Sequence, residues 1–325
     1  MDRDIRDVCL VSLADRRFMP HVSVLIASLA QSESKYPFFL LQSFLATGEQ
    51  KILRDFGASL DIEVEILTAD RNSLNRFQQC GDWPECNWMK FFIPELIPER
   101  FERVIFLDSD IVVTKSLAGL AELDLGGAAV GAVPDKQNDN PRRKARLGMP
   151  VDATYFNMGV CLIDLAQWRQ LDFGQTAARF AADQPEKISF IDQCAINATG
   201  WQHVVPIPGT WNQMVNYIAC GSELPHVIHY CGFKPWDDVK VPAREFYLAR
   251  RKDTPFPIDN WKLADVEMPW LRRRDAILNR IDSVLRPDVI PTKKRPVQRF
   301  NRKRYQEFWK AFECDLPHSR KSDVE

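Results

Sequence analysis

Buried strands and amphipathic helices alternate along the first half of the chain. Short apolar runs between turn residues are typical of strands, whereas apolar positions repeating every three or four residues indicate a helix. The predicted strands are "VCLVSLA" (8–14), "FFLLQSF" (38–44), the strictly alternating "IEVEIL" (62–67) and "RVIFL" (103–107); the predicted helices are "HVSVLIASLAQS" (21–32), a segment opened by a capping box at Thr47–Gln50 and closed by Gly57, and "NWMKFFIPELIP" (87–98). This order predicts an α/β fold with a mainly parallel sheet and helices on both faces.

The second half of the chain is less regular. It contains a predicted strand at "FNMGVCLIDL" (156–165), helices to about residue 182, a short helix at "IDQCAINA" (191–198), and strands at "HVVPIP" (203–208) and "HVIHYC" (226–231). From about residue 241 the sequence is helical and increasingly basic. We therefore predict an α/β domain over residues 1–240 and a C-terminal helical, basic region over residues 241–325.

The composition of the 325 residues is that of a globular protein, with 45% hydrophobic and 27% charged residues. The first residues, "MDRDIRD", are polar, and no apolar run reaches the length of a spanning helix, so neither a signal peptide nor a transmembrane segment is expected. Eight cysteines are scattered without a CxxC pair. This spacing indicates a reducing, cytoplasmic environment and no structural zinc.

The net charge of −1 conceals an uneven distribution along the chain. Residues 271–310 contain thirteen Arg or Lys and four Asp or Glu, a balance of +9 that leaves −10 for the remainder. Aromatic residues interleave with basic ones in "RFNRKRYQEFWKAF" (299–312), which favours attachment of residues 271–312 to an anionic membrane surface. A solvated helical subdomain is the alternative. Nucleic-acid binding is not expected, because the rest of the chain offers no supporting motif.

Two carboxylates follow a buried strand in "ERVIFLDSDIVVTKSL" (102–117). Asp108 and Asp110 flank Ser109, and an apolar run resumes at once, whereas a turn usually leads into polar sequence. Negative charges this close repel each other unless a cation lies between them. Asp15 also follows a predicted strand, and ligands of such sheets bind beyond the carboxyl ends of the strands. We therefore expect a metal site rather than a turn.

A second group of polar residues lies in "HVIHYCGFKPW" (226–236). His229 ends a predicted strand, Gly232 permits close approach of the backbone, and Lys234 supplies a point charge for phosphate oxygens. Two carboxylates and an imidazole leave open positions on a hard divalent cation, which phosphate oxygens can fill. Together the two groups predict departure of a diphosphate assisted by a Lewis acid.

Ordered sequence blocks carry a resemblance to a known family. The blocks are "SLADRRF", "MKFFIPELIPERFERVIFLDSDIVV", "AVPD", "YFNMGVCLIDLAQWR", "FIDQCAIN", "PGTWNQM" and "HYCGFKPW". From about residue 7 to 236 the chain resembles glycosyltransferase family eight, which includes glycogenin and the bacterial lipopolysaccharide α-galactosyl- and α-glucosyltransferases. The resemblance implies a GT-A fold, a UDP-sugar donor, Mn²⁺ (with Mg²⁺ as the alternative ion) and transfer of a hexose with retention of anomeric configuration. The implied acceptor is a glycan or lipid-linked glycan, such as lipopolysaccharide or another surface polysaccharide.

The resemblance also implies roles for individual residues. The implied metal ligands are Asp108, Asp110 and His229. The implied donor-binding residues are the same two carboxylates together with Ser109, Asp15 at the nucleotide base, Lys90, Asp135 at the sugar, and Gly232 and Lys234 at the diphosphate. The implied catalytic residues, which line the sugar and the acceptor, are Asn157, Asp192 and Gln193. Gln193 matches the position facing the anomeric carbon and is a poor nucleophile, which favours front-face attack through an oxocarbenium-like transition state. As alternatives, Asn157 is a polar residue at a strand start and Asp192 a helix N-cap.

Three features depart from the family pattern. Lys90 stands where arginine is common, and a lysine cannot form the bidentate fork of a guanidinium. Arg16 and Arg17 stand where acidic or amide residues are usual. Only Phe233 separates Gly232 from Lys234, where two residues are common.

Two other functions fit parts of the sequence. A haloacid-dehalogenase-type phosphatase also has a strand followed by Asp-x-Asp and an apolar pair, although its motif lies near the chain start and it leaves residues 226–236 unexplained. A catalytically inactive sugar-nucleotide-binding protein is the second alternative, and the intact set of Asp108, Asp110 and His229 argues against it. We favour a cytoplasmic glycosyltransferase that is peripheral on the inner face of the membrane.

Overall fold

The computed structural model describes residues 7–42, 45–68, 74–77, 85–217, 223–232, 234–236 and 241–256. One compact unit contains the chain up to Tyr217 together with Pro225–Phe256, and every element below belongs to it. The basic segment 271–312 lies outside the described residues, so the division into 1–240 and 241–325 and the helical nature of the basic region stay predictions. Among the described residues, no helix combines the length and apolar character needed to cross a membrane.

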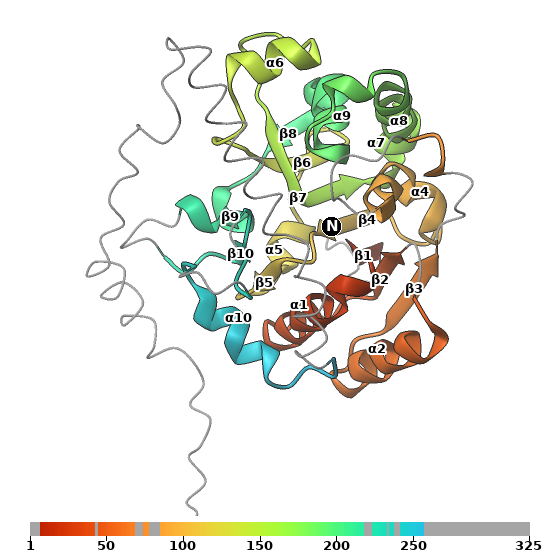
Figure 1. The fold of residues 1–325 in the computed structure, drawn as a ribbon, viewed down its shortest axis with the longest axis vertical. Helices are drawn as coiled ribbons and strands as arrows, with labels where there is room; N and C mark the ends of the chain where they lie inside the picture. Colours follow the sequence, from red (N-terminus) through yellow and green to blue (C-terminus); the bar gives the residue numbers. More distant parts are fainter. Residues whose placement is uncertain are drawn as a thin grey trace, which may run out of the picture. The chain divides into compact units, whose positions relative to one another are not determined.

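A seven-stranded sheet forms the centre of the unit (Figure 1). Its strands are β1 (Val8–Leu13), β2 (Phe38–Gln42), β3 (Val64–Thr68), β4 (Arg103–Leu107), β6 (Val130–Pro134), β7 (Phe156–Asp164) and β8 (Val204–Pro206), in the order β3-β2-β1-β4-β7-β6-β8. Neighbours are parallel except that β7 runs antiparallel to both β4 and β6. The sheet is thus mainly parallel, as predicted, with one reversed strand, β7, next to the central strand β4.

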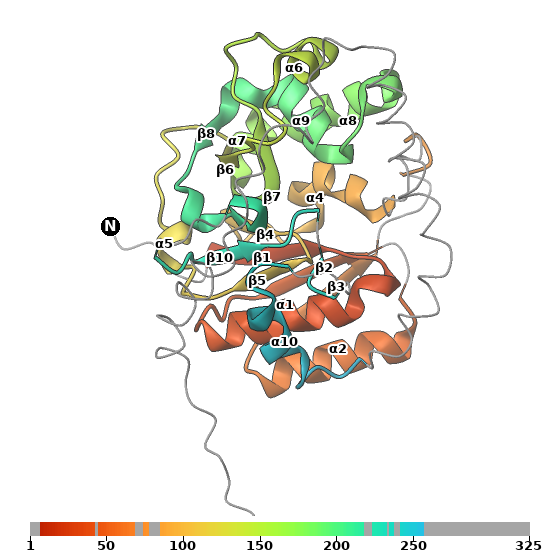
Figure 2. The same cartoon turned by 60° about the vertical axis from the view of Figure 1, so that its left-hand side comes forward.

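Both faces of the sheet are buried, which explains the uninterrupted apolar runs of its strands. Successive residues of β1 divide between two hydrophobic clusters, because side chains alternate across a strand: Leu10 belongs to one cluster, Cys9 and Val11 to the other. Figure 2 shows α1 (Met19–Gln31) and α2 (Thr47–Ser59) on one side of the sheet, and α8 (Phe173–Asp183) and α9 (Ile191–Gly200) on the other.

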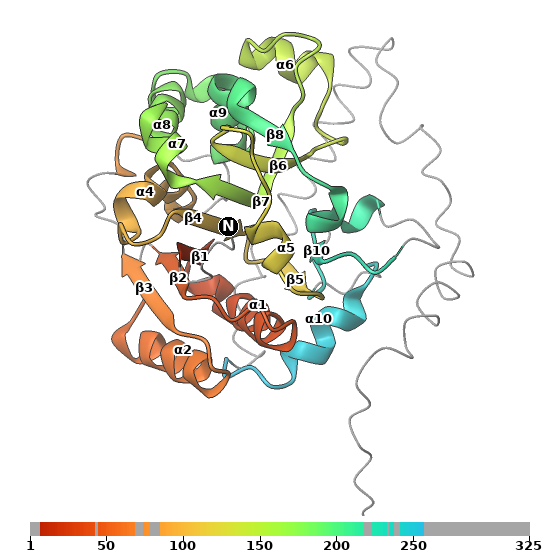
Figure 3. The same ribbon diagram turned by 180° about the vertical axis from the view of Figure 1, so that it is seen from behind.

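A second sheet continues from the carboxyl end of β4. It contains β5 (Ile111–Val113), β10 (Val227–His229) and β9 (Gln213–Met214), in the order β5-β10-β9. β10 is antiparallel to β5 and pairs His229 with Ile111. Figure 3 shows β10 beside β5 and α10 (Arg244–Arg251) beside α1. The remaining helical elements are α4 (Ile93–Leu96), α5 (Ala118–Ala121), α6 (Pro141–Leu147) and α7 (Leu165–Gln170), with 3₁₀ turns η2 (Arg16–Phe18), η3 (Glu85–Phe92), η4 (Pro185–Lys187), η5 (Trp201–His203), η6 (Gly209–Trp211) and η7 (Val215–Tyr217).

Two local predictions were wrong. The N-cap of α2 is Ala46, not Thr47, and only half of the expected box exists: the Ala46 N–H donates to the Glu49 carboxylate (3.2 Å). Gly57 does not end this helix but lies within it, where an added Cβ would come 2.3 Å from Cγ2 of Val64 on β3. The helix predicted over 87–98 is a 3₁₀ segment, η3, followed by the short α4.

Candidate active site

The two aspartates lie at the junction of the two sheets. Asp108 follows β4 directly and Asp110 precedes β5, so the chain turns at Ser109 as it passes between sheets. The Asp108 N–H donates to the Gly159 carbonyl of β7 (2.7 Å), which fixes Asp108 beside that strand. A turn is therefore present at this position, and it presents two carboxylates to a shared space.

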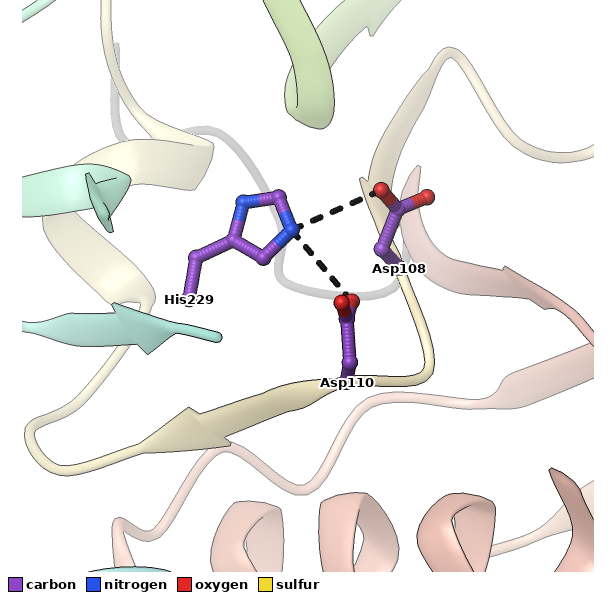
Figure 4. Close-up of side chains that lie close together, drawn as sticks. All are labelled: Asp108, Asp110 and His229. Atoms are coloured by element: carbon purple, nitrogen blue, oxygen red, sulfur yellow. Dashed lines mark ion pairs between the residues drawn. The ribbon is translucent and has the colours of Figure 1, made fainter. Parts of the chain in front are cut away.

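His229 completes a three-residue cluster (Figure 4). Its Nε2 atom lies 3.3 Å from Oδ1 of Asp110 and 3.6 Å from Oδ2 of Asp108. Backbone pairing of β10 with β5 sets this geometry, because it places His229 next to Ile111, and the Tyr230 N–H donates to the Asp110 carbonyl (3.0 Å). Ligand atoms of all three side chains lie within 4.8 Å of one another.

The arrangement fits a divalent cation. Carboxylate and imidazole ligands suit Mn²⁺ and Mg²⁺, and three protein ligands leave positions open for substrate oxygens. Gly159 provides the space behind the ligands: an added Cβ would lie 2.2 Å from Cε1 of His229 and 2.6 Å from Oδ2 of Asp108.

Asp108 and Asp110 differ in how far nearby positive charges balance their negative charges. Partial burial raises the pKa of Asp108, and the negative charge of Asp110 adds to the shift while Lys90 opposes it. Burial also acts to raise the pKa of Asp110, but the Lys234 ammonium, which forms an ion pair with it, and His229 hold that pKa well below its usual range. Asp108, whose side chain is 40% accessible, is therefore the carboxyl with room for an additional cation.

A network of amides adjoins the cluster of Asp108, Asp110 and His229. Asn157 and Gln193 both donate to Oδ2 of Asp135, from 3.4 Å and 3.1 Å respectively. Asn212 donates to Oδ1 of Asn157 (2.8 Å), and its own Oδ1 lies 2.8 Å from Nδ1 of His229. Polar groups expected at the sugar are thus connected through hydrogen bonds to one of the expected metal ligands.

Sequence comparison identifies the family. Residues 9–240 match the profile of glycosyl transferase family 8. The chain belongs to this family. General stress protein A of Bacillus subtilis (strain 168) is 24% identical to the present protein over 263 residues. The match covers 74% of the present protein and 91% of the relative. The lipopolysaccharide 1,2-glucosyltransferase of Escherichia coli (strain K12) is 20% identical over 263 residues, covering 76% and 78% respectively. Glycosyltransferase GlyF of Streptococcus pneumoniae is 26% identical over 256 residues, and the match spans only 61% of its length.

The solved structures confirm the predicted fold. The galactosyltransferase LgtC, determined in complex with donor and acceptor sugar analogues, superposes with a TM-score of 0.69 at 22% identity, covering 78% of the family 8 chain and 98% of LgtC. The chain is thus a glycosyltransferase with a GT-A-like fold. This assignment sets aside the phosphatase and the inactive binding protein as alternatives.

Lys90 and Asp192 form a buried ion pair in the family 8 chain. Their Nζ and Oδ2 atoms are 2.5 Å apart, and Lys90 also donates to the Met158 carbonyl (2.9 Å). Burial acts to lower the pKa of Lys90, but the charges of Asp192 and Asp108 and the hydrogen bond to Asp192 together outweigh it, and the pKa is raised. Asp192 lies in the first turn of α9 and the N-cap is Phe190, so the N-cap interpretation of Asp192 was wrong.

Asp15 and Gly232 occupy special backbone positions. Asp15 follows β1 and caps η2 by accepting from the Arg17 N–H (2.8 Å), while its carboxylate also pairs with the Arg17 guanidinium (2.6 Å). Arg16 pairs instead with Glu49 (2.6 Å). Gly232 has φ of 78°, a conformation that disfavours other residues and lets the backbone turn between His229 and Lys234.

Sequence reasoning missed three residues of the site. Asn212 lies in the block "PGTWNQM", but nothing in that block indicates a partner for its amide. Gly159 lies inside a buried strand, where a glycine is itself a signal for close approach of another group. Cys231 places its Sγ 3.2 Å from Nδ1 and 3.1 Å from Nε2 of His229, and the spacing of two residues is a local signal for this contact.

Proposed function

We propose that the chain transfers a hexose, glucose or galactose, from a UDP-sugar to a hydroxyl group of a glycan, with retention of anomeric configuration and with Mn²⁺ or Mg²⁺ bound. The observation that supports this most is the convergence of Asp108, Asp110 and His229 from two different sheets. These three side chains would hold the ion. When bound, it would act as a Lewis acid on the diphosphate leaving group.

The surrounding residues have separate tasks in this proposal. Lys234 and the backbone at Gly232 contact the diphosphate and stabilise its charge as it departs. Asp15 contacts the nucleotide base, and Ser109 lies between the two carboxylates at the nucleotide. Asn157 and Asp135 position the donor sugar.

Lys90 and Asp192, the residues expected at the donor and at the reacting sugar, act in this proposal as a buried ion pair (2.5 Å). Gln193 lies beneath the anomeric carbon but is engaged with Asp135 and with the Met158 N–H (3.2 Å), which fits an orienting group better than a nucleophile. We therefore favour attack on the same face that the diphosphate leaves, with a phosphate oxygen accepting the proton of the acceptor hydroxyl.

The acceptor in this proposal is lipopolysaccharide or a related surface glycan, and the protein acts in the cytoplasm at the inner face of the membrane. Support comes from relatives named for lipopolysaccharide transfer, in Escherichia coli and in Salmonella typhimurium. The basic segment 271–312 would bring the enzyme to a lipid-linked acceptor.

The test is a screen of UDP-glucose, UDP-galactose and UDP-galacturonate with Mn²⁺, with mass analysis of products on candidate glycans. We expect one donor to be hydrolysed slowly without acceptor and transferred rapidly with it. Asp110→Ala and His229→Ala should lower the rate by more than about 100-fold, whereas His203→Ala, in η5, should not. Full activity in EDTA, or release of phosphate from a simple phosphomonoester, would contradict the proposal.

A further inference from the structure

Asn212 is a buried, hydrogen-bonded residue of the site, and the proposed function gives it no role. It lies between η6 and β9 and is 1% exposed. Its amide contacts His229 on one side and Asn157 on the other, at 2.8 Å each. A buried amide with both ends engaged has a fixed orientation, and that orientation determines which atoms of its neighbours carry protons.

The orientation can be traced from a backbone group. The Gly159 N–H, which can only donate, contacts Oδ1 of Asn157 (3.0 Å). On the opposite side, Nδ2 of Asn157 faces a carboxylate oxygen of Asp135 (3.4 Å), which accepts. The polarity of the Asn157 amide is therefore fixed from both ends, with its oxygen toward Asn212.

The next two steps follow from this polarity. Because Oδ1 of Asn157 accepts, Asn212 must present Nδ2 to it, and so Oδ1 of Asn212 faces Nδ1 of His229. An amide oxygen can only accept, so Nδ1 of His229 carries a proton and donates it. The other nitrogen, Nε2, then holds the lone pair toward Asp108 and Asp110 when the ring is neutral.

Asp110 and Asp108 contact the ring at Nε2, the side that they would share with the cation, and they leave Nδ1 to other neighbours. The Cys231 Sγ atom is nearly equidistant from the two nitrogens, at 3.2 Å and 3.1 Å, so it does not favour one over the other. Gly159 has no side chain and therefore offers the ring no hydrogen-bonding side-chain group. Among the contacts described, Asn212 is thus the group that contacts Nδ1 and not Nε2.

We propose that Asn212 is a positioning residue that holds the proton on Nδ1 of His229, so that Nε2 is the ligand atom for the divalent cation. Histidine ligands commonly donate their second N–H to a group that orients the ring, and loss of that group weakens metal binding about 10–100-fold. The same amide connects the ligand to Asn157 and Asp135 in the proposed sugar pocket. The inference rests on the proposed function for the identity of that pocket, but not for the hydrogen bonds.

The two halves of the Asn212 amide can be tested separately. Asn212→Leu keeps the size of the side chain and removes both hydrogen bonds. Asn212→Asp keeps an acceptor for the Nδ1 proton but loses the donor to Asn157. Gln213→Leu is the matched control, since this neighbouring half-buried amide donates to the Met214 carbonyl (3.2 Å).

The readout is Mn²⁺ affinity without donor, measured from the free-ion signal in electron paramagnetic resonance, with circular dichroism to confirm folding. We expect Asn212→Leu to bind Mn²⁺ about 10–100-fold more weakly. Asn212→Asp and Gln213→Leu should stay within about threefold of the wild type, and Asn212→Asp should still lose transfer activity because Asn157 is released. Wild-type affinity in a folded Asn212→Leu protein would overturn the proposal.

A second measurement needs no variant. With the diamagnetic ion Mg²⁺ bound, imidazole ¹⁵N chemical shifts of the wild-type protein should show Nδ1 of His229 protonated and Nε2 unprotonated. An unprotonated Nδ1 would overturn the proposal even if Asn212→Leu did not fold. A failure of donor turnover alone, with the expected affinities and shifts, would count against the proposed function and leave the role of Asn212 intact.

Discussion

At the scale of single residues, Gly159 shows how close the proposed ligands lie to β7. A methyl group at this position would overlap both His229 and Asp108, since the distances to an added Cβ are 2.2 Å and 2.6 Å. We expect Gly159→Ala to weaken Mn²⁺ binding by more than about tenfold, because at least one ligand must move.

Gly119→Ala is the control for this substitution. An added Cβ there would make an ordinary contact with the Trp211 ring at 3.5 Å, and neither His229 nor Asp108 lies within 4 Å of it. Isothermal titration with Mn²⁺ measures both variants. Equal affinities in the two proteins would show that the cluster does not bind the ion.

Lys234 affects the same site through charge. Its ammonium pairs with Asp110 and donates to the Tyr230 carbonyl (3.1 Å), so it occupies one carboxylate that the cation would use. We expect Lys234→Met to raise Mn²⁺ affinity roughly tenfold, or ~1.4 kcal/mol, in the absence of nucleotide. With UDP present the effect should reverse, because a contact to the diphosphate is lost.

Titration of Mn²⁺ with and without UDP measures the Lys234→Met effect, and Lys252→Met, at an exposed position, serves as the control. If Lys234→Met weakened Mn²⁺ binding equally in both conditions, the ammonium would be structural rather than in competition with the cation.

The sequence was sufficient to predict that Asp108, Asp110 and His229 lie close together, because chemical type and position at a strand end are both visible in a single chain. It could not predict the contact of Asn212 with His229. The two residues are 17 positions apart, and no spacing rule places an amide against one particular ring nitrogen. This contact arises only when β9 and β10 come together.

At the scale of elements, β7 could be predicted as a strand but not in its direction. A continuous apolar run has the same pattern whichever way it runs. Because β7 is antiparallel to β4, pairing Leu107 with Val160, its amino end lies beside the carboxyl end of β4. Asn157 and Gly159 therefore reach the site edge of the sheet, which a parallel strand would not have allowed.

Elements α1 and α10 are joined by a buried histidine with a pH-dependent consequence. His21 of α1 lies 2.5 Å from the Tyr247 hydroxyl of α10 and stacks on Trp236, with ring centroids 3.4 Å apart. Burial, and then the positive charge of Arg251, lower the pKa of His21 well below 6.5; Asp110 acts in the opposite direction and Lys234 in the same one.

The sign of this effect follows from proton uptake. Above pH 6.5 neither the folded nor the unfolded state protonates His21. Below it, the unfolded state takes up a proton that the folded state does not, so stability falls as the pH falls, by up to about 1.4 kcal/mol per pH unit.

We expect urea denaturation between pH 7.5 and 5.5 to show this loss in the wild type and a smaller loss in His21→Gln. The variant retains a side chain able to hydrogen-bond Tyr247 but has no titrating ring, and all other titrating groups are common to both proteins. Parallel stability curves for the two proteins would contradict the assignment.

At the scale of the whole molecule, the basic segment 271–312 lies outside the described residues, and its proposed role in membrane binding can be tested directly. Replacing Arg302, Lys303 and Arg304 together by Gln in the full chain should weaken binding to anionic vesicles roughly 100-fold, since each basic residue contributes ~1 kcal/mol at such a surface. Replacing Lys51, Lys136 and Lys252, all exposed, removes equal charge elsewhere and should have little effect.

Co-sedimentation with vesicles at low and high salt measures both triple variants, and binding of the wild type should fall as salt rises. Equal pelleting of the two variants would show that residues 271–312 are not the membrane contact.

The separation of the site residues along the chain has a consequence for protein synthesis. β8, the last strand of the large sheet, ends at Pro206, whereas β10 begins at Val227. Because chains fold from the amino terminus as they are made, a product that stops between these points contains every strand of the large sheet and both aspartates. It lacks His229, Lys234 and the strand that brings them to Asp110. We expect an incomplete chain of this kind to contain the core of the enzyme without the third proposed ligand, and therefore to consume no donor.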